Sequence, residues 1–340
     1  GAAMREEYEL EVLEQYNIEV KGTRRIRGAF FCDTNEGTML LKETKISARR
    51  APLLYEALSR IEKRGNVKVD TPIFSKDGEL LVTSREGTVY MLKRWYQGRE
   101  CDIRQEGELL KAAGQLAILH RELDAVSAEL ESVSLPDLFP GRKSPLEEIM
   151  RHNRELKKVR SFIRGRVAKN EFEYLYLESF EKMYGMAEKV LQKMEESGCE
   201  DLYEESMRRG SLVHGDYNYH NLLILKDWMA VTGFERMCSD IQTHDLYYFM
   251  RKAMEKHHWK QKTGQKLLEA YEEERPIRPQ EREYLGLFLA YPEKFWKTAD
   301  SYYRSNKAWL PEKCVEKLRL SVRQEEEKQH FLEEVFSLNI

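Results

Sequence analysis

The sequence predicts an α+β protein with two lobes: a small lobe built on an antiparallel β-sheet with one helix, and a larger, mainly helical lobe. Three observations predict this fold class. The chain has 340 residues, which is long for one domain and short for three. Residues 17–94 consist mostly of strand-like runs separated by turn signals. From residue 104 onward, apolar residues recur at the three- and four-residue spacing that indicates helices.

The predicted small lobe covers residues 4–95, because the Gly1-Ala2-Ala3 that precedes Met4 resembles a remnant of cloning. One helix is expected at about 51–63. A hairpin turn is favoured at Thr34-Asn35-Glu36-Gly37. The polar stretch 96–100 then interrupts the pattern and is predicted to be a hinge. The strand-like runs of this lobe are 29–33, 38–42, 79–83 and 88–93.

The predicted large lobe covers residues 101–340. Its first helix has an apolar stripe that includes Leu109, Leu116 and His120, and this histidine is expected to lie in the core. Two long amphipathic segments, at about 146–167 and 171–197, predict a helical hairpin inserted at about 146–197. A strand–loop–strand unit is expected at 211–232, and helices fill the rest.

Composition excludes several classes of protein. Hydrophobic residues make up 41% of the chain and charged residues 34%, with a formal net charge of −3, whereas a nucleic-acid-binding protein would be basic. No apolar run approaches the roughly 18–20 residues of a membrane span, and no secretory signal opens the chain. The 5 cysteines are scattered and form no Cys-x-x-Cys pair, which favours reduced, cytosolic thiols over disulfides or a zinc site.

The most informative motif lies at residues 214–223, His-Gly-Asp-Tyr-Asn-Tyr-His-Asn-Leu-Leu. Asp216 precedes Asn221 by five positions, which is the spacing of catalytic loops that transfer phosphoryl groups to hydroxyls. There the Asp accepts or orients the hydroxyl proton, and the Asn holds a magnesium ion. An ordinary turn rich in His, Asp and Asn is the alternative. The preceding His-Gly and the strand-like flanks favour the catalytic-loop interpretation.

A second metal-binding Asp is expected after this loop, where the sequence reads Val231-Thr232-Gly233-Phe234-Glu235. Gly233 occupies the expected position and offers no ligand. If the lost carboxylate is the defect, Gly233→Asp should strengthen the binding of magnesium and nucleotide.

Lys42 ends a predicted strand and could neutralise nucleotide phosphates while it pairs with a helix carboxylate. Glu56 is the candidate partner and Glu62 the second choice. Surface lysines are also common at strand ends, so a role in solvation stays open. A glycine-rich phosphate cradle is not encoded between Gly22 and Gly28.

Two further polar residues are predicted to have structural roles. His214 is expected to pack under the catalytic-type loop and orient it. Asp245 opens a predicted helix at 246–256, where a carboxylate suits the helix N-terminus. The helix at 146–167 is notably basic, which indicates either a solvated face or, less simply, an anionic partner.

With these motifs in place, the chain resembles the aminoglycoside phosphotransferase and choline kinase-like superfamily. Within it, the chain is similar to the CotS-type spore-coat family of spore-forming Firmicutes. The similarity covers nearly the whole chain. The passages that carry it are YMLKRW (90–95) with GREC (98–101), HGDYNYHNLL (214–223), DLYYFMRK (245–252), and YPEKFWK (291–297) with KAW (307–309).

The resemblance implies a bilobal protein kinase-like fold that binds ATP between the lobes and carries a helical insertion before the catalytic loop. Asp216 would be the catalytic base, Asn221 a Mg²⁺ ligand and Lys42 the phosphate-binding lysine. Gly233 departs from the pattern of active members, and Glu235 is then the candidate second metal ligand. The adenine side of the nucleotide would lie against Trp95, Tyr96, Gln97 and Gly98.

Two functions follow as hypotheses. The favoured one is a kinase-like spore-coat protein of the pseudokinase type, which is made in the cytoplasm, joins the spore coat and has other spore-coat proteins as partners. It would be catalytically degenerate, with nucleotide binding retained. The alternative is an active ATP- and Mg²⁺-dependent phosphotransferase that acts on a small hydroxylated or amino-alcohol substrate. Neither involves nucleic acid or a membrane.

Overall fold

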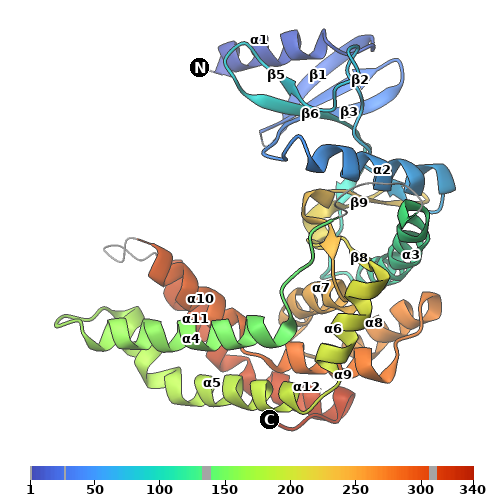
Figure 1. Ribbon diagram of the computed structural model, residues 1–340. Coiled ribbons are helices and arrows are strands. Elements are labelled where there is room, and N and C mark those ends of the chain that lie inside the picture. The colour runs from blue at the N-terminus through green and yellow to red at the C-terminus, as the bar shows by residue number, and fades with distance from the viewer. Residues whose placement is uncertain (1, 27, 132–138, 306–311) are drawn as a thin grey trace. The chain divides into compact units, whose positions relative to one another are not determined.

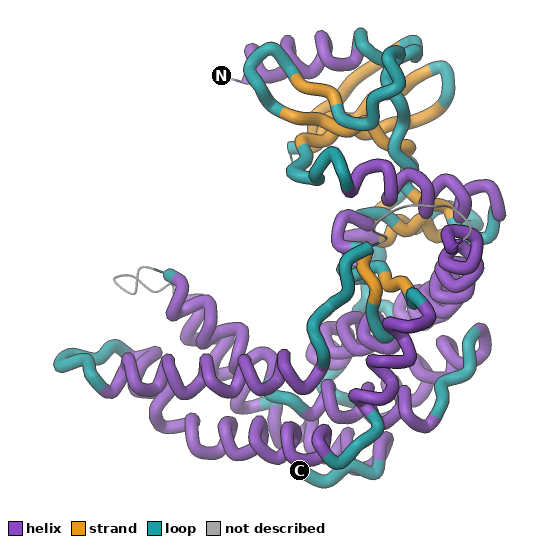
Figure 2. Tube along the Cα trace, in the orientation of Figure 1, coloured by secondary structure: helices purple, strands orange, loops and turns teal. Residues whose placement is uncertain are grey.

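The computed structural model describes residues 2–26, 28–131, 139–305 and 312–340. It confirms the predicted α+β class, with an antiparallel sheet near the N-terminus and mostly helices after residue 104 (Figures 1 and 2). The KAW passage at 307–309 lies outside the described residues.

The strands are two or three residues long apart from β1, β2, β3 and β6 of the N-terminal sheet. Their bounds are β1 Val20–Ile26, β2 Ala29–Thr34, β3 Gly37–Glu43, β4 Lys68–Val69, β5 Val82–Thr83, β6 Val89–Arg94, β7 Arg99–Glu100, β8 Leu212–Val213, β9 Leu222–Ile224, β10 Met229–Val231 and β11 Cys238–Ser239.

The helices include two single 3₁₀ turns, η1 Tyr219–Asn221 and η2 Phe234–Arg236. The α-helices are α1 Ala2–Leu13, α2 Arg50–Arg64, α3 Glu106–Glu131, α4 Pro145–Arg164, α5 Glu171–Glu195, α6 Cys199–Arg209, α7 Thr243–Lys256, α8 Gln261–Glu274, α9 Pro279–Ala290, α10 Glu293–Arg304, α11 Glu312–Arg323 and α12 Glu325–Phe336.

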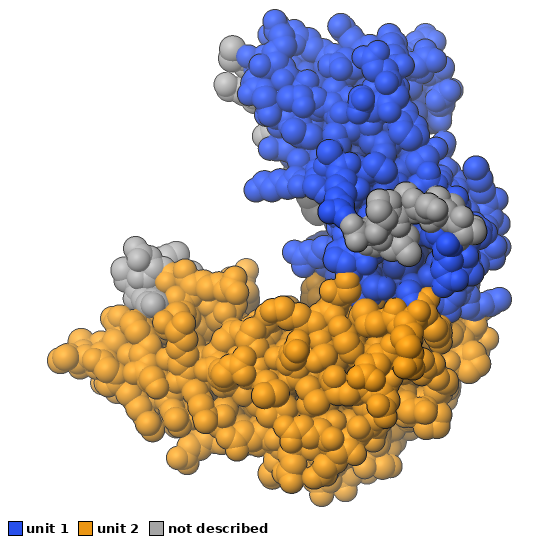
Figure 3. All heavy atoms as spheres, viewed as in Figure 1, with its two compact units in different colours: residues 1–140, 210–239 blue, residues 141–209, 240–340 orange. Residues whose placement is uncertain are grey.

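The chain divides into two compact units, and each is discontinuous in sequence (Figure 3). The first comprises Gly1–Pro140 and Gly210–Ser239, and the second comprises Gly141–Arg209 and Asp240–Ile340. The first unit therefore contains the N-terminal sheet, α3 and the loop with the Asp216 motif. The predicted lobes, 4–95 and 101–340, follow a different line of division and stay a prediction.

The N-terminal sheet has the strand order β1-β2-β3-β6-β5 and is antiparallel throughout. One face packs against α1, where Val12 and Leu13 meet Phe30 and Met39. The opposite face packs against α2, where Ala51 meets Met91. Helix α1 was not predicted from the sequence.

The predicted strand at 79–83 is wrong for its first half, because only β5, Val82–Thr83, is a strand. Residues 75–79 instead form a closed turn. In it, Gly78 donates its N–H to the Ser75 carbonyl at 3.0 Å, and the Glu79 N–H bonds the Ser75 hydroxyl at 3.1 Å. Hydrogen bonds within the turn thus use backbone groups that a strand would offer to a neighbour.

A second sheet, β4-β10-β9-β7, joins the predicted hinge to the strands that follow the motif loop. Strand β4 runs parallel to β10, while β7 pairs antiparallel with β9. The stretch 96–100, predicted to be a hinge without regular structure, therefore contains a strand at its end. Arg99 and Glu100 are paired with Ile224 and Leu223.

The second unit is helical in its described parts, and α4 and α5 form the predicted hairpin. Several basic side chains of α4 lie over aromatic rings: Lys157 over Tyr184 at 5.3 Å and Arg160 over Phe180 at 4.3 Å. Cation–π contacts of this kind give part of the basic side chains of α4 a partner within the protein. In the described residues, no helix is both long and apolar enough to cross a bilayer.

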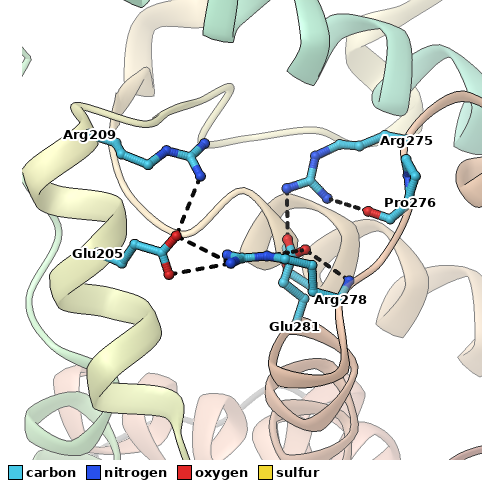
Figure 4. A network of polar contacts seen from close by, with 7 residues as sticks. Glu205, Arg209, Arg275, Pro276, Arg278 and Glu281 are labelled. Carbon is cyan, nitrogen blue, oxygen red and sulfur yellow. Dashed lines mark hydrogen bonds and ion pairs between the residues drawn. The ribbon is translucent and has the colours of Figure 1, made fainter.

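A polar network ties α6 to the start of α9 in the second unit (Figure 4). Glu205 pairs with Arg278 at 3.2 Å, and Glu281 accepts the Arg278 backbone N–H at 3.1 Å as well as the Arg275 guanidinium at 2.7 Å. Glu281 is buried, so its contacts with Arg275 and Arg278 satisfy a charge that would otherwise be costly.

Candidate active site

The motif loop begins with a glycine that no other residue could replace without rearrangement. Strand β8 pairs with β11, and the chain then turns at Gly215, whose φ is +88°. A Cβ atom at this position would lie 2.2 Å from the Arg236 carbonyl oxygen. The positive φ and the close backbone approach both require glycine here.

His214 is fully buried beneath the loop. Its Nδ1 accepts the Asp216 backbone N–H at 3.0 Å, so Nε2 carries the proton and donates to the Thr232 carbonyl at 2.8 Å. The ring also packs on Phe234, with centroids 4.4 Å apart. His214 thus connects the start of the motif loop to the segment before Gly233, and its orienting role stays a prediction.

The middle of the loop is anchored to α3 by Tyr217. This side chain is fully buried, and its hydroxyl donates to the Ala112 carbonyl at 2.7 Å. A buried hydroxyl needs such a partner, so the contact fixes the loop against the helix.

Asp216 lies half-buried between two side-chain amides. Asn218 Nδ2 donates to Asp216 Oδ1 at 3.0 Å, and Asn221 Nδ2 donates to Asp216 Oδ2 at 3.3 Å and to the Asp216 carbonyl at 2.9 Å. The predicted pair, Asp216 and Asn221, is therefore brought into direct contact. Asn218 was not singled out in the sequence, although it holds the same carboxylate.

Gly233 and Asn221 also meet. Gly233 has φ +73°, and a Cβ atom built on it would lie 2.5 Å from Asn221 Oδ1 and 2.6 Å from Asn221 Cγ. The Asn221 amide thus occupies the space in which an Asp side chain at position 233 would begin. The Gly233 N–H donates to Asp70 Oδ2 at 3.0 Å.

Next to Gly233 lies a set of three charged side chains, Asp70, Lys93 and Glu235, which we call the charge cluster. Lys93 Nζ is 3.1 Å from Asp70 Oδ2 and also forms an ion pair with Glu235. The side chain of Lys93 is 4% exposed and that of Asp70 1%, whereas that of Glu235 is 27% exposed. The charge cluster thus joins three segments that are far apart in sequence: the residue after β4, strand β6 and the turn η2.

Strand geometry explains why Lys93 points toward this site. Side chains alternate along a strand, so Lys93 shares a face with Met91, which packs on α2, while Leu92 faces α1. In the β3–β6 register Lys42 is opposite Met91 and Leu40 is opposite Lys93. The two lysines are therefore diagonal neighbours on one face of the sheet.

The charge cluster shifts the titration of its members. Burial raises the pKa of Asp70 in spite of the Lys93 ammonium. Burial also acts to raise the pKa of Glu235, but Lys93 and Lys42 outweigh it and lower that pKa to about 2. Burial alone would lower the pKa of Lys93, and the two carboxylates reverse this and raise it. Lys93 and Glu235 are thus both charged at neutral pH.

The predicted pairing of Lys42 with Glu56 is not present in the described residues. Lys42 is exposed and interacts electrostatically with Glu235, while Glu56 pairs with Arg60 one helical turn later. The second choice, Glu62, pairs with Arg94 at 2.5 Å. The i,i+4 spacing within α2 offers Glu56 a nearer cation than β3 does. A phosphate-binding role for Lys42 stays a prediction.

The predicted adenine-side residues connect the N-terminal sheet to the sheet β4-β10-β9-β7. The Trp95 N–H donates to the Thr38 carbonyl at 3.0 Å, and the Tyr96 hydroxyl donates to the Val69 carbonyl at 2.7 Å. Gln97 Nε2 lies 3.3 Å from the Thr38 hydroxyl. Their role in nucleotide binding stays a prediction.

Gly98 is held closely against β9, since a Cβ atom there would lie 2.7 Å from the Ile224 carbonyl oxygen. Asp245 belongs to the second compact unit, where it lies buried in the first turn of α7. This placement fits the favourable effect of a carboxylate near a helix N-terminus.

Sequence reasoning missed Lys93 and Asp70, which are buried charges beside Gly233. The signal was a charged residue at the end of each apolar run, Val67-Lys68-Val69-Asp70 and Tyr90-Met91-Leu92-Lys93. A buried charge is retained when it is paired. Which residue supplies the partner is visible only in the fold.

The residues present do not fit the magnesium site that a kinase-like fold implies. Mg²⁺ needs oxygen ligands that are free to coordinate it. Gly233 provides none, both carboxylates near Gly233 are paired with Lys93, and Asn221, whose Nδ2 donates to Asp216, offers one amide oxygen. Among the described residues, no group of three or more His, Cys, Asp or Glu is placed to hold a metal ion.

Comparison with solved structures defines the class of fold. An aminoglycoside phosphotransferase from Alicyclobacillus acidocaldarius superposes with a TM-score of 0.82 at 15% identity, covering 96% of this chain and 95% of that one. Amicoumacin kinase hAmiN, in complex with AMP-PNP, Ca²⁺ and Ami, gives a TM-score of 0.59 at 14% identity over 94% and 93%. The chain has the kinase-like fold of aminoglycoside phosphotransferases.

Family comparison then places the chain more narrowly. The family described as "Spore coat putative kinase YutH" matches residues 9–335, so the chain belongs to that family. The curated protein "Spore coat protein S" of Bacillus subtilis (strain 168) is 22% identical over 335 residues, which are 96% of this chain and 93% of that protein. The predicted resemblance to spore-coat proteins is confirmed, and the fold is that of aminoglycoside phosphotransferases.

Proposed function

We propose that this protein is a catalytically degenerate kinase of the spore coat, which binds nucleotide and takes part in coat assembly with other coat proteins. Family membership supports the coat role and a location in the spore coat after synthesis in the cytoplasm. The AMP-PNP in amicoumacin kinase, which shares the fold, supports nucleotide binding.

The observation that carries the degenerate part is the contact between Gly233 and Asn221. Transfer of a phosphoryl group depends on metal ions that bridge the phosphates and offset developing charge. In this chain the position of one metal ligand is a glycine, so of the expected pair only Asn221, whose Nδ2 donates to the Asp216 carbonyl, offers an oxygen. Glu235, the remaining candidate, is neutralised by Lys93.

Turnover is the direct test. Purified protein is incubated with ATP, Mg²⁺ and a panel of small alcohols, amino alcohols and aminoglycosides, and ADP is measured against the Asp216→Asn variant as control. We expect no ADP formation above that control. Turnover that Asp216→Asn abolishes would contradict the proposal and favour the alternative, an active ATP- and Mg²⁺-dependent phosphotransferase. The specific observation on that side is the ordered Asp216 carboxylate.

Nucleotide binding is tested separately from turnover. A ligand that binds only the folded state raises the melting temperature with its concentration. We therefore expect millimolar ATP to raise Tm, and Lys42→Ala to reduce the shift. An unchanged Tm in ATP would contradict the proposed nucleotide binding and would leave only the proposed role in coat assembly.

The coat role is tested in spores of a bacterium that carries this gene. Deletion is expected to change the pattern of extractable coat proteins, whereas Asp216→Asn is expected to leave it as in wild type. A coat defect in the Asp216→Asn strain equal to that of the deletion would show that assembly needs the catalytic carboxylate.

A further inference from the structure

The charge cluster already contains a cation, and that cation is a side chain. Lys93 Nζ lies between two carboxylates that belong to separate segments, the stretch after β4 and the turn η2. Two carboxylates around one cation are also the protein contribution to many magnesium sites, where waters complete the coordination.

A second observation at the same place points to a cation of higher charge. Asp70 is 1% exposed, and its Oδ2 already accepts from Lys93 and from the Gly233 N–H. Its other oxygen, Oδ1, is buried and has no hydrogen-bond partner within the described part of the chain. Lys93 thus satisfies only part of the acceptor capacity that Asp70 and Glu235 offer.

The formal charges lead to the same conclusion. When both carboxylates are ionised, the one ammonium leaves the charge cluster with an excess negative charge, and the burial that raises the pKa of Asp70 makes this charge costly. An unsatisfied buried acceptor and an excess negative charge are both removed by a divalent ion and not by an ammonium.

We propose that Asp70 and Glu235 form a latent site for a hard divalent cation, and that the Lys93 ammonium is its resident cation and excludes metal. Substitution of Lys93 by a neutral residue opens the site to Mg²⁺ or Mn²⁺. A second consequence rests on the proposed function: if the chain binds nucleotide, it does so without a divalent ion.

The test uses Mn²⁺ as the probe in the full-length protein without nucleotide. Isothermal titration calorimetry and the electron paramagnetic resonance of free Mn²⁺ compare wild type with Lys93→Met. We expect the variant to bind Mn²⁺ at least about tenfold more tightly than wild type. The double variant Lys93→Met with Asp70→Asn is expected to lose this binding, and Lys93→Arg, which keeps the charge, is expected not to gain it.

Folded Lys93→Met that binds Mn²⁺ no better than wild type would overturn the proposal, as would a wild-type protein that binds Mn²⁺ with the affinity expected of the variant. If Lys93→Met does not fold, Lys93→Gln is used, because its amide retains a hydrogen bond to Asp70 while the charge is removed. The same two outcomes then decide.

The nucleotide consequence has its own measurement. ATP binding to wild type is compared in EDTA and in Mg²⁺, and dissociation constants within about twofold are expected. A loss of about tenfold or more in EDTA would overturn a metal-independent mode. Absence of ATP binding in both buffers would instead contradict the proposed function, while the Mn²⁺ titrations still decide the latent site.

Discussion

Gly215 and Gly233 both have positive φ, but the atoms that an added Cβ would meet differ in how easily they can move away. At Gly215 the obstacle is the Arg236 backbone carbonyl, whose oxygen lies 2.2 Å from the place a Cβ would take, whereas at Gly233 it is the end of the Asn221 side chain. A side chain can rotate away, and a backbone carbonyl in a paired segment cannot do so without moving η2.

We therefore expect Gly215→Ala to lower the free energy of unfolding by at least about 2 kcal/mol, because a positive φ and a backbone clash add. Gly185→Ala is the matched control, since Gly185 lies inside α5 with nothing within 4 Å of a Cβ. It should raise stability by about 0.5–1 kcal/mol. Urea denaturation measures the change in the free energy of unfolding for both variants. A change of the same sign in the two variants would contradict the proposed role of Gly215.

Gly233→Asp illustrates how the structure changes an expectation from sequence. The substitution puts a Cβ against the Asn221 amide and should cost about 1–3 kcal/mol of stability. It should not by itself restore magnesium binding, because Lys93 still occupies the adjacent carboxylates. Calorimetry with Mg²⁺ measures this binding. If Gly233→Asp alone binds magnesium, the missing carboxylate at position 233 is the only defect, as the sequence suggested.

At the scale of elements, the ion pair of Glu235 with Lys93 fastens the turn η2 to strand β6, and Arg50 of α2 adds a bond to the Glu235 carbonyl at 3.0 Å. The pKa of Glu235, about 2 in the fold, lies below its ordinary value of 4.5. The pair therefore stabilises the fold above about pH 4.5, and this contribution is lost as the pH falls toward 2.

Glu235→Gln is expected to lower stability by roughly 2–3 kcal/mol at pH 7 and by much less near pH 2.5. Urea denaturation at the two pH values gives the difference. Glu36→Gln, at the exposed hairpin turn, controls for the loss of one carboxylate. A destabilisation by Glu235→Gln that is as large at pH 2.5 as at pH 7 would show that the ion pair is not its source.

Element by element, the sequence predicted what depends on local pattern. The hairpin at Thr34–Gly37, the helix α2 and the long hairpin of α4 and α5 follow from turn residues and from apolar spacing. Helix α1 and the short strands β4 and β7 were missed, since such elements are defined by the neighbours they pair with. Asp216 and Asn221 were singled out because they belong to one local motif. Lys93 was missed because its partners, Asp70 and Glu235, lie in distant segments of the sequence.

At the scale of the whole molecule, the chain passes between its two compact units three times, at residues 140/141, 209/210 and 239/240. The first unit needs its second segment, because β9 and β10 complete the sheet that contains β4 and β7. That segment also brings Glu235 to Lys93 and the Gly233 N–H to Asp70.

A fragment of residues 1–140 alone is therefore expected not to unfold cooperatively. Joining it to 210–239 through a short Gly/Ser linker should restore a cooperative transition. The join is short in space, because the Ser239 N–H donates to the Pro140 carbonyl at 3.0 Å and Ser239 pairs with Leu212. Circular dichroism during thermal unfolding compares the two fragments, and a cooperative transition in 1–140 by itself would refute the expectation.

The position of Lys93 between Asp70 and Glu235 also bears on descent. Loss of Lys93 alone strands two carboxylates in a poorly solvated place, which typically costs about 3–5 kcal/mol. An aspartate gained at position 233 alone meets the Asn221 side-chain amide and an ammonium that repels metal. Each single step thus costs stability, so in a lineage that carries this cluster a divalent-cation site would be gained at lower cost when a second substitution compensates the first.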